Sequence, residues 1–350
     1  MGQVLNVALV GYGFVGRVFH APLIATTPGL RLHTVVSRDA AKVHSDWPDA
    51  RVVADPTHAF ADGAIDLVVI AAPNAVHASL AIAALRAGRH VLVDKPFTTS
   101  LAEARGVLDV ARSAGRLASV FQNRRWDTDF LALRALVESG TLGEMAELHS
   151  HFDRFRPQVP DRWRERAGPG AGLWFDLGPH LVDQALQLFG TPLSIQADLA
   201  TQRADAVVDD WFHVVLRYPR LRVVLHAGAL VAANTLRFAA HGTGGSYVKH
   251  GLDPQEDALR AGTRPGSPDW GLDRRPGELT TMGADGPVTQ AIDGPRGDYR
   301  ACYAAMRDAI LGQGEAPVTP AQALAVMQVL DAGVASAASA RSIALADTAG

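Results

Sequence analysis

The sequence predicts an α/β protein with an N-terminal doubly wound parallel sheet and a C-terminal α+β domain built on a large open, mostly antiparallel sheet. The first observation is length, since 350 residues exceed the usual single domain of about 100–200 residues. The second is that short apolar runs alternate with helical stretches as far as residue 121, as buried parallel strands do. Beyond residue 122 the predicted strands alternate polar and apolar residues, which indicates one exposed face. We therefore place the domains at residues 1–121 and 122–350.

Each predicted strand of the first domain is a short run rich in valine, leucine or isoleucine. These strands are Leu5–Val10, Leu32–Val36, Leu67–Ala71, His90–Val93 and Leu117–Phe121. Helical stretches separate them and complete a parallel βαβ pattern, as at Val76–Ala87 and Leu101–Ala114.

The second domain opens with a predicted helix at Asp127–Glu138. Its half-exposed strands are Glu147–Phe152, Ile195–Ala200, Trp211–Tyr218, Arg222–Ala229, Leu236–His241 and Ser246–His250. Pro219-Arg220 between two of them predicts a tight hairpin, and the Gly, Pro and Asp residues of 253–295 predict long loops with little regular structure. Thr319 as N-cap and Pro320 at the first helical position predict a last, alanine-rich helix to about Ala338.

The charge balance and the cysteine count narrow the class of protein. The 33 Lys plus Arg against 36 Asp plus Glu give a net charge of −3 without long charged runs, which argues against nucleic acid or a membrane and leaves small solutes as partners. Cys302 is the only cysteine, which excludes an internal disulfide and a Cys-rich metal site. Without a leader or a continuous apolar run of about 18 residues, the sequence predicts a cytoplasmic protein.

The turn after the first predicted strand, Gly11-Tyr-Gly13-Phe14-Val15-Gly16, indicates a dinucleotide site. Its G-x-G-x-x-G spacing lies between a strand and a helix, which is the context in which this spacing binds a pyrophosphate. Gly11 permits the tight turn, Gly13 lets the backbone approach the phosphates, and Gly16 lets the helix pack closely on the strand. The helix N-terminus adds N–H donors for the same anion.

The end of the second strand bears on the choice between NADP and NAD. An acidic residue there would bind the ribose 2′-hydroxyl of NAD, but this strand ends in Ser37-Arg38. Hydroxyl and guanidinium donors favour the 2′-phosphate of NADP. Asp39 leaves NAD open, although it also suits the N-cap of a helix over Ala40–His44. The sequence therefore favours NADP, with NAD as the alternative.

Two further clusters carry groups that can move protons. Lys95 follows Asp94 at the carboxyl end of a buried strand, where ligands of open α/β sheets bind. Asp176 and His180 are one helical turn apart, so a carboxylate can orient an imidazole that titrates near neutral pH. Each also has a structural interpretation: a lysine reaching solvent, a helix cap and a core histidine. A metal site through Asp176, His180 and Asp183 is a weaker alternative, and we predict no metal.

Together these motifs resemble the glucose-fructose oxidoreductase, inositol dehydrogenase and MocA (Gfo/Idh/MocA) family of NAD(P)-dependent oxidoreductases over essentially the full chain. The motifs that carry the resemblance are Gly11–Gly16, Pro73–His77, Asp94–Pro96 and Asp176–His180. Three longer segments are similar to a YdgJ-type bacterial branch, which is close to NADP-dependent scyllo-inositol dehydrogenases. These are Phe121–Trp126, His151–Pro157 and Trp174–Gln184.

The resemblance implies a Rossmann domain followed by a domain whose open sheet mediates homodimers or homotetramers. It implies that Lys95 binds the reacting hydroxyl, that His180 is the acid/base, and that Asp176 holds a substrate hydroxyl and orients the site. It also places four residues along the nicotinamide half of the cofactor: Pro73, Asn74, His77 and Gln122. The usual Glu-Lys-Pro appears here as Asp94-Lys95-Pro96, which shortens the acid by one methylene and changes how it reaches the cofactor.

The predicted activity is reversible oxidation of a secondary alcohol on a cyclic polyol or sugar. Hydroxyl-rich ligands need several donors and an aromatic wall, so the substrate-facing candidates are Arg125, Arg154 and Trp163. For each of these, surface pairing or core packing is the alternative. Two other interpretations remain: a nucleotide-sensing regulator that has lost the chemistry, and a reductase of a non-sugar carbonyl. Retention of Lys95, Asp176 and His180 together argues against the regulator.

Overall fold

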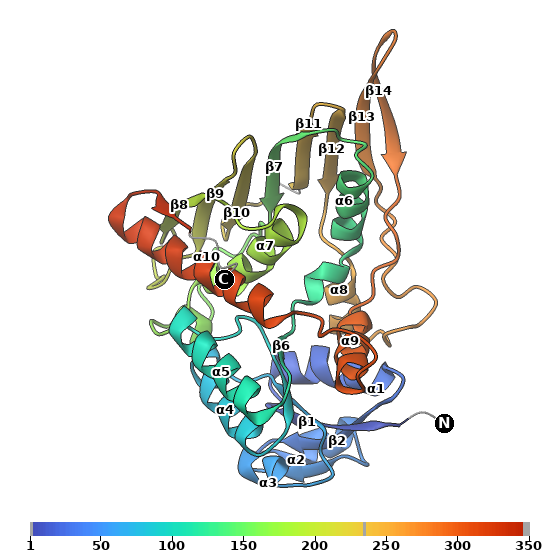
Figure 1. The fold of residues 1–350 in the computed structure, drawn as a ribbon, viewed down its shortest axis with the longest axis vertical. Helices are drawn as coiled ribbons and strands as arrows, with labels where there is room; N and C mark the ends of the chain where they lie inside the picture. Colours follow the sequence, from blue (N-terminus) through green and yellow to red (C-terminus); the bar gives the residue numbers. More distant parts are fainter. Residues whose placement is uncertain (1–2, 234–235, 346–350) are drawn as a thin grey trace. The chain divides into compact units, whose positions relative to one another are not determined.

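The chain forms two compact units in the computed structural model, which describes residues 3–233 and 236–345 (Figure 1). The first unit contains Met1–Asn123, Gln255–Trp270 and Asp298–Leu324, and the second contains Arg124–Pro254, Gly271–Gly297 and Ala325–Gly350. Two segments from the last third of the chain therefore belong to the first unit. A single domain boundary near residue 121 does not describe this return of the chain.

The first unit is built on a six-stranded parallel sheet in the order β3-β2-β1-β4-β5-β6. The strands are β1 (Leu5–Val10), β2 (Leu30–Val36), β3 (Arg51–Val53), β4 (Leu67–Ile70), β5 (His90–Val93) and β6 (Ala118–Val120). The connections contain η1 (Gly16–His20), α1 (Ala21–Thr26), α2 (Ala40–Asp46), α3 (Pro56–Phe60), η2 (Asn74–Val76), α4 (His77–Arg86) and α5 (Leu101–Ala114). The doubly wound parallel sheet is confirmed, and β3 is the strand that the sequence analysis missed.

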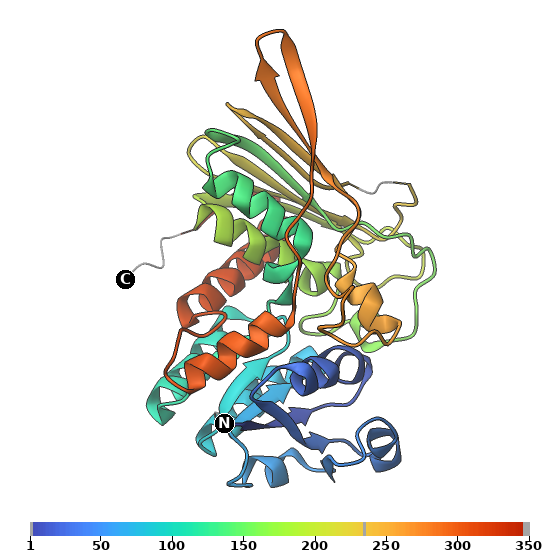
Figure 2. The same cartoon turned by 90° about the vertical axis from the view of Figure 1, so that its right-hand side faces the viewer.

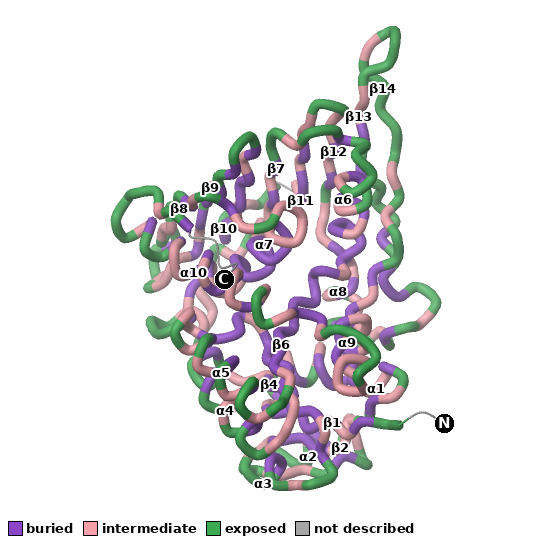
Figure 3. The backbone as a smooth tube through the Cα atoms, in the orientation of Figure 1, coloured by how far each residue is buried: buried purple, intermediate pink, exposed green. Residues whose placement is uncertain are grey.

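Burial explains the composition of this sheet. All four residues of β4 are buried, and so are the last three of β5 (Figure 3). A strand with both faces covered has no solvent side on which to place polar residues, so its sequence is continuously apolar. Functional groups of such a sheet are therefore confined to the loops at its ends.

The second unit is built on a nine-stranded sheet in the order β14-β13-β12-β11-β7-β10-β9-β8-β15. Its strands are β7 (Met145–His151), β8 (Ser194–Ala200), β9 (Trp211–Arg217), β10 (Arg222–Gly228), β11 (Leu236–Gly242), β12 (Gly245–His250), β13 (Gly277–Gly283), β14 (Gly286–Ile292) and β15 (Ile343–Ala344). All named neighbours are antiparallel except β7 and β10. The predicted hairpin at Pro219-Arg220 is present, because Tyr218 N–H donates to the Leu221 carbonyl at 3.0 Å.

Helices lie against one face of this second sheet. They are α6 (Thr128–Glu138), α7 (Leu173–Phe189) and the later part of α10 (Pro320–Ser339), all on one side in Figure 2. Along β9 the side chains of Phe212, Val214 and Leu216 are buried, whereas His213 and Arg217 between and beyond them are exposed. The alternation that predicts one covered face and one open face is confirmed.

The expectation of irregular loops over residues 253–295 is wrong. This stretch contains α8 (Gln255–Arg260) and the β13–β14 hairpin, whose ladder runs from Gly277 opposite Ile292 to Gly283 opposite Gly286. The hairpin is at an edge of the sheet, and most residues of β14 are exposed whether they are polar or apolar, Val288 among them, so no hydrophobic alternation marks it. Threonines such as Thr280, Thr281 and Thr289 supply β-branched residues instead.

The last helix begins as the sequence predicts. Thr319 Oγ1 accepts from Gln322 N–H at 3.3 Å, while Gln322 Oε1 accepts from Thr319 N–H at 3.1 Å, which is a reciprocal capping box. By length and composition alone, α10 could cross a membrane, and it is the one helix of the described residues that could. Core helices of globular domains pass the same test, and in the second unit Trp174 Nε1 donates to the Leu330 carbonyl at 3.1 Å.

Three helical segments remain to be named. They are η3 (Asn123–Trp126), η4 (Trp163–Glu165) and α9 (Arg300–Ile310). The last of these belongs to the first unit, together with α8.

Candidate functional site

Four sequence motifs meet at the carboxyl edge of the first sheet. The glycine turn follows β1, Pro73–His77 follows β4, Asp94–Pro96 follows β5, and Gln122 follows β6. These four strands are neighbours in the sheet and all run parallel, so their carboxyl ends share one edge. Ligands of open α/β sheets bind at this edge, next to the point where the strand order reverses.

The glycine turn has the shape of a phosphate cradle. Gly11 has φ +98°, and a Cβ there would lie 2.4 Å from the Ala71 carbonyl oxygen, so only glycine fits. A Cβ on Gly16 would lie 2.0 Å from the Gly11 carbonyl oxygen. A Cβ on Gly13 would meet nothing within 4 Å. The protein's own packing thus does not explain Gly13, whereas close approach of a pyrophosphate to the backbone does.

The loop after β2 presents the residues expected to distinguish the cofactors. Asp39 Oδ1 accepts from Lys42 N–H at 3.0 Å, so its role as N-cap of α2 is confirmed. Ser37 Oγ accepts from Asp39 N–H at 3.1 Å. Arg38 is exposed and makes no hydrogen bond or ion pair within the described parts of the chain. Its guanidinium is therefore available to an incoming anion.

His77 joins the loops that follow β4 and β5. Its ring is fully buried, with Nε2 at 2.9 Å from the Ala72 carbonyl oxygen and Nδ1 at 2.8 Å from the Pro96 carbonyl oxygen. The Lys95–Pro96 peptide bond is cis. Because both ring nitrogens face backbone carbonyls, His77 positions the two loops, including the peptide that follows Lys95. Asn74 is also buried beside this loop.

Asp94 is a buried carboxylate with an aromatic and imidazole network behind it. Its Oδ1 accepts from Lys95 N–H at 2.9 Å and lies 3.8 Å from His20 Nε2. His20 Nδ1 is in turn 2.6 Å from the hydroxyl of Tyr303 on α9. Burial alone would raise the pKa of Asp94, but the neighbouring imidazole of His20 and the charge of Lys95 hold it below its usual range. Asp94 is therefore ionised beside the half-buried Lys95.

Sequence reasoning missed His20 and Tyr303. The two side chains are 283 positions apart in the chain, His20 at the end of η1 and Tyr303 within α9. Neither position carries a spacing that marks it as a partner of Asp94. Only the return of α9 to the first unit brings Tyr303 to the His20 ring.

Gln122 carries an unsatisfied polar atom at the same sheet edge. The residue is 3% exposed, and its Oε1 is buried without a hydrogen-bond partner. Leaving a buried acceptor without a hydrogen bond costs free energy, so an unpaired acceptor in a folded protein indicates a donor from a bound ligand or water. Together with the open space at Gly13, it shows that this edge fits a dinucleotide cofactor, and an amide of that cofactor is a suitable donor for Gln122.

Helix α7 of the second unit carries Asp176 and His180. The two residues are four positions apart on one helix, as predicted, and His180 is 5% exposed. Asp176 is not the N-cap, because the helix begins at Leu173, after Gly172. The helix start is held instead by Asp209, whose carboxylate accepts from Trp174 N–H at 2.6 Å. Burial raises the pKa of Asp209 to about 6, despite the backbone donors.

A pocket of the second unit is lined in part by Asp176 and contains both positive and negative groups. Its charged residues are Arg154, Arg156, Arg162, Arg164, Arg203, Glu165, Asp176, Asp209 and Asp210. Arg203 is held by Asp210 at 2.8 Å and Glu165 at 2.7 Å, and Arg164 lies 3.7 Å from Asp176. Hydroxyl groups can both donate and accept, so this lining suits a polyhydroxylated ligand.

The three predicted substrate-facing residues have different surroundings. Arg154 lines the pocket, with its guanidinium 4.8 Å from the centre of the Phe152 ring. Arg125 is buried and forms a two-bonded ion pair with Asp183, at 2.6 and 2.8 Å. Trp163 is 36% exposed, does not line the pocket, and is covered by the Arg164 guanidinium. The additional arginines of the pocket had a sequence signal, since several fall between residues 154 and 166.

The Asp183–Arg125 pair also bears on the metal interpretation. Both carboxylate oxygens of Asp183 accept from Arg125, so this residue is not arranged as a metal ligand beside His180. Over the described residues, one group of side chains has metal-ligand geometry, and it lies elsewhere: His151, Asp153 and His226.

A parallel dinucleotide-type domain joined to an α+β domain with a polar pocket defines a two-domain nicotinamide-dependent oxidoreductase. Two family models match the chain: "Oxidoreductase family, NAD-binding Rossmann fold" over residues 5–122, and "Oxidoreductase family, C-terminal alpha/beta domain" over residues 134–345. The chain therefore belongs to the Gfo/Idh/MocA oxidoreductase family, as its motifs predict.

Individual relatives agree with this assignment. The chain is 52% identical to the uncharacterized oxidoreductase YdgJ of Escherichia coli K12, over 96% of this chain and 97% of that one. It is 36% identical to the scyllo-inositol 2-dehydrogenase (NADP(+)) IolW of Bacillus subtilis 168, over 97% and 96% of the two chains. A solved structure of the putative oxidoreductase YPO2259 from Yersinia pestis superposes with a TM-score of 0.95 at 48% identity, covering 99% of each chain.

Proposed function

We propose that this protein catalyses the reversible oxidation of a secondary alcohol on a cyclic polyol or sugar, with NADP as the preferred cofactor. The observation that carries the proposal is the convergence of the glycine cradle, the His77 loop, Asp94-Lys95 and Gln122 on one edge of the first sheet. A similar chain named as an NADP-dependent inositol dehydrogenase supports the same substrate and cofactor class.

The residues of the first unit would hold the cofactor and the reacting oxygen. Gly11, Gly13 and Gly16 would bind the pyrophosphate, and Arg38 the 2′-phosphate that distinguishes NADP. When bound, the nicotinamide ring supplies a reversible acceptor and donor of hydride. Lys95 would stabilise the negative charge that develops on the substrate oxygen. An ammonium beside that atom interacts more favourably with the charged oxygen of the transition state than with the neutral hydroxyl of the ground state.

The residues of α7 would manage the substrate proton. His180 would remove the hydroxyl proton during oxidation and return it during reduction, because a neutral imidazole nitrogen accepts a proton and an imidazolium releases one. Asp176 would hold a substrate hydroxyl and orient the site. The pocket arginines beside Asp176 would bind further hydroxyls of the same ligand.

The test is a panel of inositols, aldoses and sugar acids incubated with NADP and with NAD, followed by the absorbance of the reduced nicotinamide. The proposal expects turnover of at least one cyclic polyol or sugar, faster at low cofactor concentration with NADP than with NAD. The reverse assay uses the corresponding ketones with the reduced cofactors. Tight cofactor binding without turnover in either direction would indicate a regulator, whereas turnover confined to non-sugar carbonyls would overturn the substrate class.

A further inference from the structure

A row of histidines crosses the open face of the second sheet. His213 on β9 pairs with His226 on β10, and His226 pairs in register with His151 on β7. The three rings follow one another across adjacent strands, with centroids 5.7 Å and 4.9 Å apart. This face is opposite to the one covered by α7 and α10 (Figure 2). Nothing in the proposed oxidoreductase chemistry uses these residues.

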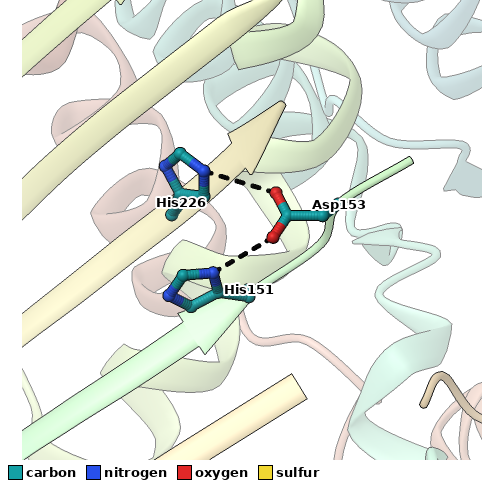
Figure 4. A group of neighbouring side chains, drawn as sticks. All are labelled: His151, Asp153 and His226. Atoms are coloured by element: carbon teal, nitrogen blue, oxygen red, sulfur yellow. Dashed lines mark hydrogen bonds and ion pairs between the residues drawn. The ribbon is translucent and has the colours of Figure 1, made fainter. Parts of the chain in front are cut away.

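At the β7 end of this row, a carboxylate lies between two of the rings. Asp153 Oδ2 is 3.2 Å from His151 Nδ1, and Asp153 Oδ1 is 3.3 Å from His226 Nε2 (Figure 4). One ligand atom from each of the three side chains lies within 4.8 Å of the others. Asp153 is 2% exposed, while the two imidazoles are 15% and 13% exposed, so the group is sheltered yet reachable from solvent.

These separations match those of ligands that share one metal ion. Zn²⁺ binds His nitrogen and carboxylate oxygen at about 2.0–2.2 Å, and two such ligands at a tetrahedral angle are roughly 3.3–3.5 Å apart. Charge-assisted hydrogen bonds between the same groups are shorter, at about 2.7–2.9 Å. The two observed contacts are thus closer to a ligand pair than to strong ion pairs. Each ring faces a different oxygen of the Asp153 carboxylate, so both oxygens are directed toward the two imidazoles (Figure 4).

The backbone fixes the carboxylate as a metal site requires. Gly228 N–H donates to Asp153 Oδ1 at 3.0 Å, which ties the end of β7 to the end of β10. Partners of this kind orient a ligand and raise metal affinity. The two imidazoles come from paired positions of neighbouring strands, so their spacing is set by the sheet itself. Two of the ligands therefore lie on paired strands, and the third lies just after β7, where the Gly228 N–H holds its carboxylate.

We propose that His151, Asp153 and His226 bind one Zn²⁺ ion, with water completing the coordination. Two imidazoles and one carboxylate form a donor set suited to zinc, and not to Mg²⁺ or Ca²⁺, which take mainly oxygen ligands. The proposed zinc site and the charged pocket beside Asp176 are built from the same two chain segments. Arg154, which directly follows Asp153, lines that pocket, and so do Gly228 and Ala229. Bound zinc would fix the strand ends from which Arg154 extends.

The experiment uses the full chain after dialysis against a chelator, and Zn²⁺ alone as the probe. Titration against a chromophoric zinc indicator measures affinity and stoichiometry, and Co²⁺ substitution reports the geometry through its visible absorption. We expect one Zn²⁺ per chain in the micromolar range or tighter, a tetrahedral Co²⁺ spectrum, and no competition from Mg²⁺. His226→Gln and Asp153→Asn should each weaken binding roughly 100-fold or more, since even partners of ligands contribute about 10- to 100-fold.

The matched control is His149→Gln, which removes a half-exposed histidine of β7 outside the group. It should bind Zn²⁺ as the unaltered protein does, and circular dichroism should show that all three variants are folded. A Kd in the millimolar range for the unaltered protein would overturn the proposal. So would equal losses in His149→Gln and His226→Gln, because these would indicate unspecific chelation by surface histidines.

Discussion

The two sheets of this protein place their functional groups differently. In the first sheet, side chains on both faces are buried, so the candidate residues lie in loops at one edge: Gly13, Asn74, Lys95 and Gln122. In the second sheet, one face is covered and the other is open, so polar residues also occur within strands, as the histidine row shows. A buried parallel sheet thus concentrates its chemistry at the strand ends, whereas an open sheet can also use its surface.

The largest expected effect is on turnover and comes from His180 in the second unit, whereas cofactor binding belongs to the first unit and should not change. His180→Ala should lower turnover by about 10²- to 10⁴-fold, the range for a positioned general acid/base, without changing NADP affinity. Steady-state kinetics and a cofactor titration measure the two quantities. If Asp176 acts through His180, Asp176→Asn combined with His180→Ala will cost much less than the product of the single losses. Normal turnover per folded molecule in His180→Ala would leave His180 a core residue.

The next effect tests the edge of the first sheet. Lys95→Met should reduce turnover by about 10²- to 10³-fold, as removal of one donor to a developing oxyanion does. Lys95→Arg should not restore it, because the guanidinium has a different shape and does not share its proton. Folding and NADP binding, followed by thermal melting and fluorescence titration, should stay close to the unaltered protein. Near-native activity in either variant would remove Lys95 from the reaction.

A smaller effect concerns the choice of cofactor. Arg38→Ala should weaken NADP binding by roughly 10- to 150-fold, equivalent to about 1.5–3 kcal/mol for a charge-assisted hydrogen bond, and should leave NAD almost unchanged. Arg105→Ala is the matched control, because Arg105 is an exposed arginine on α5. Equal losses for the two cofactors in Arg38→Ala would contradict its role at the 2′-phosphate.

The last effect is on stability rather than on turnover or binding, and it concerns the start of α7. The folded-state pKa of Asp209 is raised to about 6, above its usual 3.8, so the folded protein holds a proton that the unfolded chain releases between these values. The contribution of Asp209 is therefore most favourable below about pH 4 and is lost as pH rises through about 6, by an amount on the order of 3 kcal/mol. Asp209→Asn should flatten this part of the pH profile.

Chemical denaturation at several pH values between about 4 and 7 measures that profile. The exposed Asp205 provides the control, since Asp205→Asn should leave the slope of the free energy of unfolding unchanged. An unchanged slope in Asp209→Asn would show that backbone N–H groups, such as that of Trp174, fully compensate the buried charge.

The sequence predicts contiguous features better than assembled ones. The glycine turn, Asp94-Lys95 and the Asp176–His180 spacing are recognisable because each lies within one short segment. The Asp94–His20–Tyr303 network is not, because its members come from distant segments that the fold brings together. His151 and His226 become neighbours only through strand register, which no local spacing reveals. The β13–β14 hairpin was missed because exposed edge strands carry no hydrophobic alternation.

The most direct test of the central claim, that the edge of the first sheet holds a dinucleotide, is NADP binding by Gly13→Ala. A Cβ at Gly13 meets no protein atom within 4 Å, so the variant should fold and melt as the unaltered protein does. The same holds for Gly63→Ala, which serves as the control because Gly63 is equally open and lies in another loop. The account predicts that Gly13→Ala loses NADP affinity severely while Gly63→Ala keeps it. Equal, native-like NADP affinity in both variants would contradict it.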